Sequence, residues 1–419
     1  MKRAALAALL SLGCAGRTAP EPAAPPAANP EAFSIPLAAP ESLGFDAAAL
    51  NQITTYLRTE VDSAFPGAVV AVGRHGHLAL LEGVGHYAVD DARPVNPATI
   101  YDLASVTKVV GLTTACMLLV SEGKLDLDAP VQRYVPEFRG QLKEQVKIRH
   151  LLTHSSGLPA WQPLFAGAKN RARVFALVDT TTLLRAPGDT FVYSDLGAIL
   201  LTQVVERITG QRLDRYLAAN VFTPLGMATT RYLPPKNWRE LIAPTERDTV
   251  FRKRMLHGEV HDENAGRMDG VSGHAGLFST APDLARFAVW VLRSTEHNAR
   301  STNAGEDAVL RAPCSVKCPP PEVFRAFATR QDIPPHSTRA LGWDTPSDSG
   351  YSSAGTLLSR RSIGHTGYTG TSIWMDPERD LFVILLTNRV HPTRTNTRIS
   401  QVRPRVADLV VQALVAPER

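Results

Sequence analysis

Apolar residues recur every three or four positions in several stretches of the chain, a spacing that places them on one face of a helix. In residues 46–63 these positions are Leu50, Ile53, Leu57 and Val61. That stretch is therefore predicted to be an amphipathic helix. The same kind of pattern predicts helices over 105–122, 146–159, 195–220 (with a break at Gly210), 281–294, 323–329 and 407–415.

Strand-like segments lie near both ends of the sequence, where β-branched and aromatic residues are frequent. Residues 66–88 are predicted to form two strands joined by a turn near positions 75–77. Further strands are predicted at 340–345, 364–377 and 381–388, separated by turn residues. Strands thus stand at the two ends of the chain and helices fill the middle.

This order of elements predicts an α+β fold. We expect one antiparallel sheet built from both ends of the chain, flanked by the terminal helices, with an inserted and mainly helical lobe. The sheet lobe would comprise residues 41–104 and 340–419, and the helical lobe residues 105–339. Residues 295–339 are polar, Pro-rich and contain two cysteines, so we expect a surface insertion there.

The first residues resemble an export signal. Lys2 and Arg3 precede an apolar stretch at 4–12, which is the arrangement of a signal peptide, predicted here over 1–14. The apolar stretch is too short to span a bilayer. We therefore expect an exported, periplasmic protein.

Cys14 stands where bacterial lipoproteins carry their lipidated cysteine, which predicts attachment to the membrane. Ser11 occupies the position at which that motif usually has Leu, so a plain secretory signal is the alternative. Residues 15–40 are rich in Ala and Pro and are predicted to form an extended tether.

Charge and cysteine content exclude some other classes. A net charge of +5 over 419 residues, with no dense Lys/Arg block, does not indicate a nucleic-acid partner. Cys116 lies in an apolar run and is expected to be buried. Cys314 and Cys318 could pair in an exported protein, but they make a poor zinc site because no histidine lies near them. We predict neither a metal nor a cofactor.

Ser105 and Lys108 stand at the head of the helix predicted over 105–122. Residues three apart lie on the same face of a helix, so the amine and the hydroxyl would be neighbours. A serine needs such a neighbouring base to become a nucleophile, and a lysine can be that base only when it is neutral. Taken alone, however, the pair fits a helix-capping serine and a surface lysine better.

Two other polar groups change this interpretation. Tyr-Ser-Asp at 193–195 precedes a helical run, and His-Thr-Gly at 365–367 opens an apolar strand. The order of these three motifs resembles that of the serine β-lactamase and penicillin-binding superfamily. The tyrosine in the first place of the triplet is similar to the class C branch, as are the stretches 151–161 and 273–287. The resemblance covers roughly residues 41–417.

The resemblance implies a β-lactamase/transpeptidase-like fold and a role for each matching residue. Ser105 would be the acylated nucleophile and Lys108 the amine that activates it. Tyr193 would be the partner general base, with its phenolate favoured by Lys108. Whether Lys108 or Tyr193 takes the first proton is left open. The backbone N–H groups of Ser105 and Tyr368 would form the oxyanion hole, a device that contributes on the order of a hundredfold or more in rate.

The strand-like motif at the C-terminal end would bind substrate. His365 and Thr366 would line a strand edge where a substrate carboxylate or carbonyl docks, and Gly367 would let the substrate lie against that edge. Two residues depart from the class C pattern. Asp195 stands in place of Asn and would repel an anion unless it is protonated or paired with Lys108. His365 stands in place of Lys, and a histidine, unlike a lysine, can be neutral near neutral pH.

Three more histidines attract attention. His261 lies in the stretch 258–265, which resembles segments of carboxypeptidase-like penicillin-binding proteins, and it is a candidate for substrate binding. A metal site there is the weaker alternative, because adjacent residues do not share a face. His154 is expected to be structural, and His274, between two glycines, is a weaker candidate for lining the cleft.

We therefore predict an exported serine hydrolase that works through an acyl-enzyme on Ser105. The favoured activity is that of a D-Ala-D-Ala carboxypeptidase or D-amino-acid peptidase on cell-wall peptides. A carboxylesterase for short acyl esters is the first alternative and a class C-type β-lactamase the second. A non-catalytic penicillin-binding module on the same fold is disfavoured, because Ser105, Lys108 and Tyr193 are all retained.

Overall fold

The computed structural model describes residues 35–296 and 317–415. The predicted signal segment with Cys14, most of the predicted tether and Cys314 lie outside this range. Cys318 is exposed and Cys116 is buried. The pairing of Cys314 with Cys318 and the lipidation of Cys14 stay predictions.

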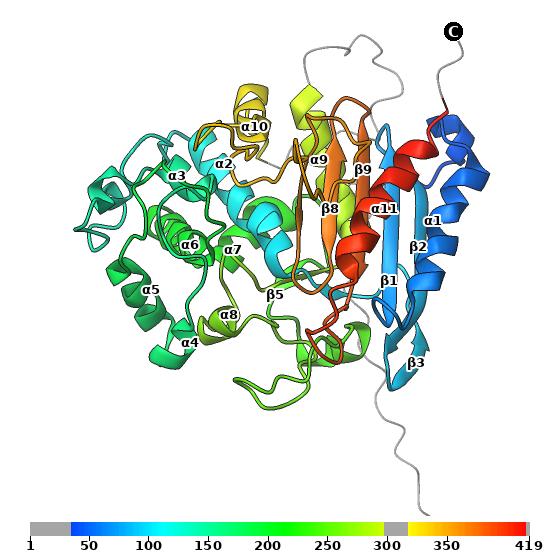
Figure 1. The fold of residues 1–419 in the computed structure, drawn as a ribbon, viewed down its shortest axis with the longest axis horizontal. Coiled ribbons are helices and arrows are strands. Elements are labelled where there is room, and N and C mark those ends of the chain that lie inside the picture. The colour runs from blue at the N-terminus through cyan, green and yellow to red at the C-terminus, as the bar shows by residue number, and fades with distance from the viewer. Residues whose placement is uncertain (1–34, 297–316, 416–419) are drawn as a thin grey trace, which may run out of the picture.

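The centre of the fold is an antiparallel sheet made from both ends of the chain, as predicted (Figure 1). Its strand order is β3-β2-β1-β9-β8-β7, so a strand from the N-terminal part pairs with one from the C-terminal part at the middle of the sheet. In that central pair, Ala68 lies opposite Thr387. The strands are β1 (Gly67–Arg74), β2 (His77–Ala88), β3 (Asp91–Pro94), β7 (Ile363–Thr366), β8 (Ser372–Asp376) and β9 (Leu381–Thr387).

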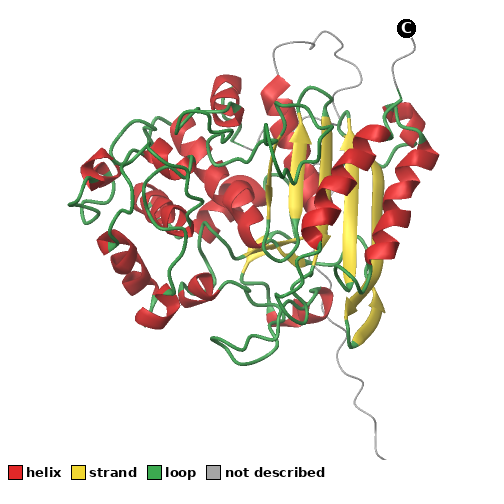
Figure 2. Cartoon of the chain, in the orientation of Figure 1, coloured by secondary structure: helices red, strands yellow, loops and turns green. Residues whose placement is uncertain are grey.

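Helices account for most of the remaining chain (Figure 2). They are α1 (Ala47–Glu60), α2 (Thr114–Ser121), α3 (Ile148–Leu152), α4 (Leu164–Gly167), α5 (Arg171–Thr180), α6 (Asp195–Thr209), α7 (Leu213–Leu217), α8 (Glu263–Arg267), α9 (Ala281–Glu296), α10 (Pro321–Ala328) and α11 (Ile399–Gln412). A small second sheet has the order β4-β6-β5, from β4 (Tyr101–Asp102), β5 (Arg231–Tyr232) and β6 (Leu277–Ser279).

The central strands are apolar throughout because both faces of the sheet are covered. Successive side chains of a strand point to opposite faces. Val70 and Val72 of β1 accordingly join the core beneath α1 and α11, whereas Val69 and Ala71 join the core shared with the helical part. Figure 1 shows α1 and α11 side by side on one face of this sheet.

The helical part packs on the opposite face of the sheet through α9. This helix lies in the range that we assigned to the helical lobe, yet it covers the sheet. α9 contacts β1, β8 and β9. The predicted surface insertion is also not wholly at the surface. Phe324 and Phe327 of α10 are buried, and the Phe324 ring meets Trp290 of α9 at a centroid distance of 5.1 Å. The amphipathic face of α10 therefore belongs to the core.

Other differences from the predictions concern short or irregular segments. Residues 340–345 do not form a strand, because only the single bridge between Asp344 and Gly364 joins them to β7. The last helix begins at Ile399 rather than at 407 and contains Pro404. The small sheet was not predicted, since strands of two or three residues show no periodic pattern.

One described helical run, Ala104–Ser121, is long and apolar enough to cross a membrane by length and composition. However, 83% of it is buried inside the protein. It is therefore the core helix between the sheet and the helical part, and its start carries Ser105 and Lys108.

Candidate active site

Ser105 lies in a tight turn with an irregular backbone. The turn Ala104–Val106 is a 3-10 helix, followed by a π-helical turn at Lys108–Thr113 and then by α2. Ala104 adopts a left-handed conformation, with φ of +45°. This conformation is unfavourable for a residue with a side chain, so neighbouring contacts must hold it in place.

Asp102 supplies one of these contacts, and it was not predicted from the sequence. Its Oδ1 accepts the Ala104 N–H at 2.8 Å, and its Oδ2 accepts the His261 N–H at 2.7 Å. Burial raises the pKa of Asp102, and the two N–H groups offset this only in part. One buried carboxyl group thus fixes both the serine turn and the segment that carries His261.

Lys108 is the most connected side chain of the site. It is 97% buried, and its Nζ lies 2.9 Å from Ser105 Oγ, 2.7 Å from Asp195 Oδ1 and 3.1 Å from the carbonyl oxygen of His274. Burial acts to lower the pKa of Lys108, but the charges of Asp195 and Tyr193 outweigh it and raise the pKa. Lys108 is therefore an ammonium ion at rest. Its pairing with Asp195 is one of the two conditions under which we expected Asp195 not to repel a substrate anion.

Tyr193 joins the same cluster and hydrogen-bonds to both Lys108 and Ser105. The Lys108 Nζ lies 4.8 Å from the centroid of the Tyr193 ring. Burial raises the pKa of Tyr193. The positive charge of Lys108 lowers that pKa, but by less than burial raises it. The tyrosine is thus a neutral phenol at rest, and the phenolate that the resemblance implied is not its resting form.

His154 positions Tyr193, which agrees with its expected structural role. The Ser194 N–H donates to His154 Nδ1 at 3.1 Å, and the Val192 N–H donates to the His154 carbonyl at 2.8 Å. The two rings meet at a centroid distance of 4.6 Å. The side chain of Ser194 then accepts the Gly197 N–H at 3.1 Å and caps α6, so that Tyr193 and Asp195 flank the start of this helix.

The turn after β7 is fastened to the serine turn from the sheet side. Thr369 donates to the carbonyl of Asp102 at 2.7 Å, and Thr371 donates to the carbonyl of Leu103 at 2.9 Å. A Cβ atom at Gly367 would overlap the Leu103 carbonyl and the Thr371 hydroxyl, so only glycine fits. These contacts hold Tyr368 and Ser105 on adjoining segments. The oxyanion hole formed by their N–H groups stays a prediction.

His365 lies on β7 beside Tyr193, with a centroid distance of 5.8 Å between the rings. Burial, together with the positive charges of Arg339 and Lys108, holds the pKa of His365 well below its usual range. Its Nδ1 therefore carries the proton that it shares with the Thr366 carbonyl at 2.8 Å. The ring is neutral, and it cannot supply the positive charge of the lysine that it replaces.

The cluster at 261–263 is not built as a metal site. The three side chains point to different partners: His261 to Glu246 at 2.9 Å, Asp262 to His274 at 2.8 Å and Glu263 to an arginine. Among the residues that the structure describes, no group of three His, Cys, Asp or Glu side chains could hold a metal ion. Each side chain instead stabilises its own part of the loop.

His261 was a candidate for binding substrate, but its geometry gives it a different role. The ring is buried, and its Nε2 faces Glu246. It stacks under the half-exposed Tyr368 at a centroid distance of 5.7 Å. His261 therefore supports Tyr368, which follows the predicted substrate-binding motif, and does not present a ring nitrogen to a ligand.

His274 acts through its backbone, which the sequence could not indicate. Its side chain is only 1% exposed and does not line a cleft. Ser272 Oγ lies 2.7 Å from Nδ1, and Asp262 Oδ1 lies 2.8 Å from Nε2. This chain of hydrogen bonds orients the His274 carbonyl toward Lys108. In the sequence only the two flanking glycines set His274 apart, and they do not indicate a role for its carbonyl.

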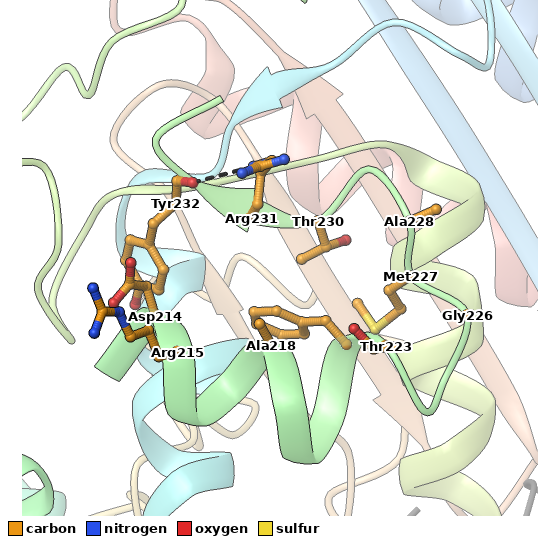
Figure 3. Close-up of a pocket in the computed structure, with 11 residues that line it drawn as sticks. Asp214, Arg215, Ala218, Thr223, Gly226, Met227, Ala228, Thr230, Arg231 and Tyr232 are labelled. Carbon is orange, nitrogen blue, oxygen red and sulfur yellow. Dashed lines mark hydrogen bonds between the residues drawn. The ribbon is translucent and has the colours of Figure 1, made fainter. Parts of the chain in front are cut away.

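A separate hollow of about 490 Å³ lies beside α7 and β5 (Figure 3). Asp214, Arg215 and Tyr232 stand at one end of it and Met227 near the other. None of its lining residues is a predicted site residue. The chemistry is therefore assigned to the cluster around Lys108, where Ser105, Tyr193 and Asp195 meet.

Comparisons with known proteins agree with this geometry. A family model described as Beta-lactamase matches residues 51–406. The chain belongs to the Beta-lactamase family. A protein of Escherichia coli O157:H7, provisionally named a D-alanyl-D-alanine carboxypeptidase, is 32% identical over 389 residues, which are 84% of this chain and 85% of the relative. As a member of this family the protein is a serine hydrolase with a small-molecule or peptide substrate.

Solved structures share the fold. EstCE1, described as a hydrolase with promiscuous acyltransferase activity, has a TM-score of 0.66 at 21% identity and covers 87% of this chain and 99% of its own. A class C β-lactamase has a TM-score of 0.66 at 21% identity, with coverages of 88% and 97%. The predicted α+β architecture is thereby confirmed.

Gly367→Ala tests the fastening of the two turns. The added methyl group would push the turn that carries Tyr368 away from Leu103 and Ser105. We expect kcat/KM for an activated ester to fall on the order of a hundredfold, as when an oxyanion donor is lost, and the thermal midpoint to fall as well, because the methyl group meets the Leu103 backbone. Gly167→Ala, at an exposed site with room for a methyl group, is the control. An unchanged kcat/KM would show that the turn does not position the reacting atoms.

Asp195→Asn tests the charge balance. The carboxylate raises the pKa of Lys108 and of Tyr193, so its removal lowers both. Because a general base must be deprotonated, kcat/KM rises with pH through the pKa of that base. The rising limb should therefore move to lower pH in the variant, whichever of the two residues is the base. The exposed Asp189→Asn should leave the limb in place, and a shift to higher pH would contradict the assignment.

Proposed function

We propose that this serine hydrolase is a D-Ala-D-Ala carboxypeptidase or D-amino-acid peptidase that acts on cell-wall peptides. The observation that carries the proposal is the buried cluster in which the Lys108 ammonium contacts Ser105 Oγ while Tyr193 hydrogen-bonds to both. This cluster can form and hydrolyse an acyl-enzyme. The provisional name of the E. coli relative supports the peptide substrate.

The charge states determine how the serine is activated. At rest the cluster holds an ammonium ion, a phenol and the Asp195 carboxylate. Once Lys108 has lost a proton to solvent, the neutral amine lies 2.9 Å from Ser105 Oγ and 2.7 Å from Asp195. It takes the hydroxyl proton as the oxygen attacks the carbonyl carbon of the penultimate residue. This route makes Lys108 the first proton acceptor, and Asp195 stabilises the ammonium ion that forms.

The remaining steps return the protons. The bond to the terminal D-alanine breaks, and its nitrogen takes a proton that Tyr193 relays from Lys108. The acyl group is now an ester of Ser105. A water molecule adds to that ester, giving its proton to the same amine, and the shortened peptide leaves as a carboxylic acid while Ser105 regains its hydrogen. No group outside the chain, the substrate and water is required.

A carboxylesterase is the second candidate, and one observation favours it. His365 is neutral and buried, so the strand edge itself presents no positive charge to a substrate carboxylate. An ester substrate needs none. The same acyl-enzyme chemistry would then act on short acyl esters.

The activity can be decided with three probes on the purified protein. We expect wild type to release D-alanine from an N-acyl-D-Ala-D-Ala peptide, Ser105→Ala to lose this activity at least a thousandfold, and the exposed Ser400→Ala to retain it. A labelled penicillin should form a stable adduct on Ser105, visible by mass spectrometry. Rapid turnover of penicillin would indicate a β-lactamase instead. An ester burst with no D-alanine release and no adduct would indicate an esterase.

We propose further that the protein is exported and anchored through Cys14. The basic pair at 2–3, the apolar stretch at 4–12 and the position of the cysteine support this. Cells expressing the full chain should incorporate labelled palmitate into wild type but not into Cys14→Ser. Label-free protein in the soluble periplasmic fraction would leave export standing and refute the anchor, whereas cytoplasmic protein of full length would refute both.

A further inference from the structure

The hollow beside α7 and β5 takes no part in the chemistry described above, yet it has the features of a binding site (Figure 3). Pockets that bind small molecules measure roughly 300 to 1,000 Å³, and this hollow, at about 490 Å³, falls in that range. Its floor is apolar, because the buried side chains of Phe222, Met227 and Tyr232 line it. The hollow can therefore enclose the apolar body of a small molecule.

The charged residues of the hollow leave an excess of positive charge. Arg215, Arg231 and Asp214 line it. Asp214 would repel an anion, but its charge is balanced by Arg212, whose Nε lies 2.7 Å from Asp214 Oδ1. Within the described residues, neither Arg215 nor Arg231 forms an ion pair with a carboxylate. Two guanidinium groups are thus available to an anionic ligand.

The helix that forms one wall of the hollow is irregular. Ala218–Phe222 is a π-helical turn that directly follows α7. Such turns are rare, and they occur frequently at functional sites. The π-helical turn Lys108–Thr113 begins with the lysine of the active site. The same irregularity of the backbone therefore accompanies both the active site and the hollow.

The π-helical turn that carries Lys108 packs directly against α7 and against the floor of the hollow. The contact is made at Gly111, where a Cβ atom would lie 3.2 Å from Leu217 Cδ1 and 3.2 Å from the hydroxyl oxygen of Tyr232. Because interiors are close-packed, a displacement on one side of such a contact is felt on the other. The hollow and the turn of Lys108 are thus neighbours through Tyr232.

Tyr232 also holds the segment that supplies a carbonyl to Lys108. Its hydroxyl donates to the Ser272 carbonyl at 3.0 Å, and its ring would lie 3.0 Å from a Cβ atom at Gly276. His274 lies between these two contacts, and its carbonyl accepts from Lys108 at 3.1 Å. The ring of Tyr232 therefore lines the hollow, while its hydroxyl fixes a partner of the active-site cation.

We propose that the hollow is an effector site for a small amphipathic acid, and that its occupation changes the turnover of the serine hydrolase. The apolar floor would bury the body of this ligand, and a guanidinium group suits its carboxylate. A ligand shifts only those equilibria whose states it binds differently. Contact with Tyr232 gives it that influence over the cluster around Lys108, whatever acyl substrate the enzyme hydrolyses.

Octanoate is the probe, and acetate and 1-octanol are its counterparts without the apolar body and without the charge. Binding is measured by calorimetry, and turnover with an activated ester. We expect octanoate to bind more tightly than either counterpart and, at saturation, to change kcat on the order of fivefold. Arg215→Gln should weaken octanoate on the order of tenfold. The matched control is Arg173→Gln on α5, an exposed arginine that likewise has no carboxylate partner within the described residues, and it should leave binding unchanged.

Tyr232→Phe separates binding from coupling, because it keeps the ring and removes the hydrogen bond to Ser272. Octanoate should still bind to this variant, but kcat should no longer respond to it when compared with the variant's own rate without ligand. Competition at the active site would instead raise KM at unchanged kcat and would not depend on Arg215. That result, or equal binding of octanoate and 1-octanol, would overturn the site, and binding to wild type without a change in kcat would overturn its effector role.

Discussion

A lysine ammonium ion buried away from water needs partners on every side, and the arrangement around Lys108 is the consequence. Removing such a group from water costs several kcal/mol unless charge and hydrogen bonds compensate. Here a hydroxyl, a carboxylate and a carbonyl do so, and they come from the serine turn, from the start of α6 and from the segment before β6. The demands of one cation therefore bring three distant segments to a common point.

The sheet side of the site is held by contacts of another kind. The serine turn contains a left-handed Ala104, and its backbone is fixed by Asp102 from within and by Thr369 and Thr371 from the turn after β7. The strands β7 and β8, which flank that turn, lie in a sheet whose two faces are both buried. Strain at the nucleophile is thus maintained by a core that extends to the terminal helices.

Much of this could be predicted from the sequence, and the physical reason is the length of the pattern. Apolar residues repeat at regular spacing over the whole length of β1, β9, α1 and α9, so these elements could be predicted. Ser105, Lys108 and Tyr193 belong to motifs that are recognised in combination. Segments of two to five residues have no such period. The small sheet and the irregular stretch at 340–345 were therefore missed or assigned wrongly.

The parts of the site that escaped prediction act through the backbone or through charge balance. His274 contributes a carbonyl, and Asp102 contributes acceptors to two N–H groups, so neither role depends on a side-chain motif at a fixed spacing. The resting charges of Lys108 and Tyr193 are also decided by burial and by Asp195 together, which only coordinates reveal.

The pairing of Lys108 with Asp195 separates two tasks that a free cation would combine. A lysine with an unpaired charge would attract the substrate anion to the atom that must later accept a proton. With Asp195 as the counter-charge, the proton-transfer cluster is electrically balanced before substrate arrives. Any attraction for an anionic substrate must then come from a cation outside that cluster. Neutral His365 on β7 cannot provide it.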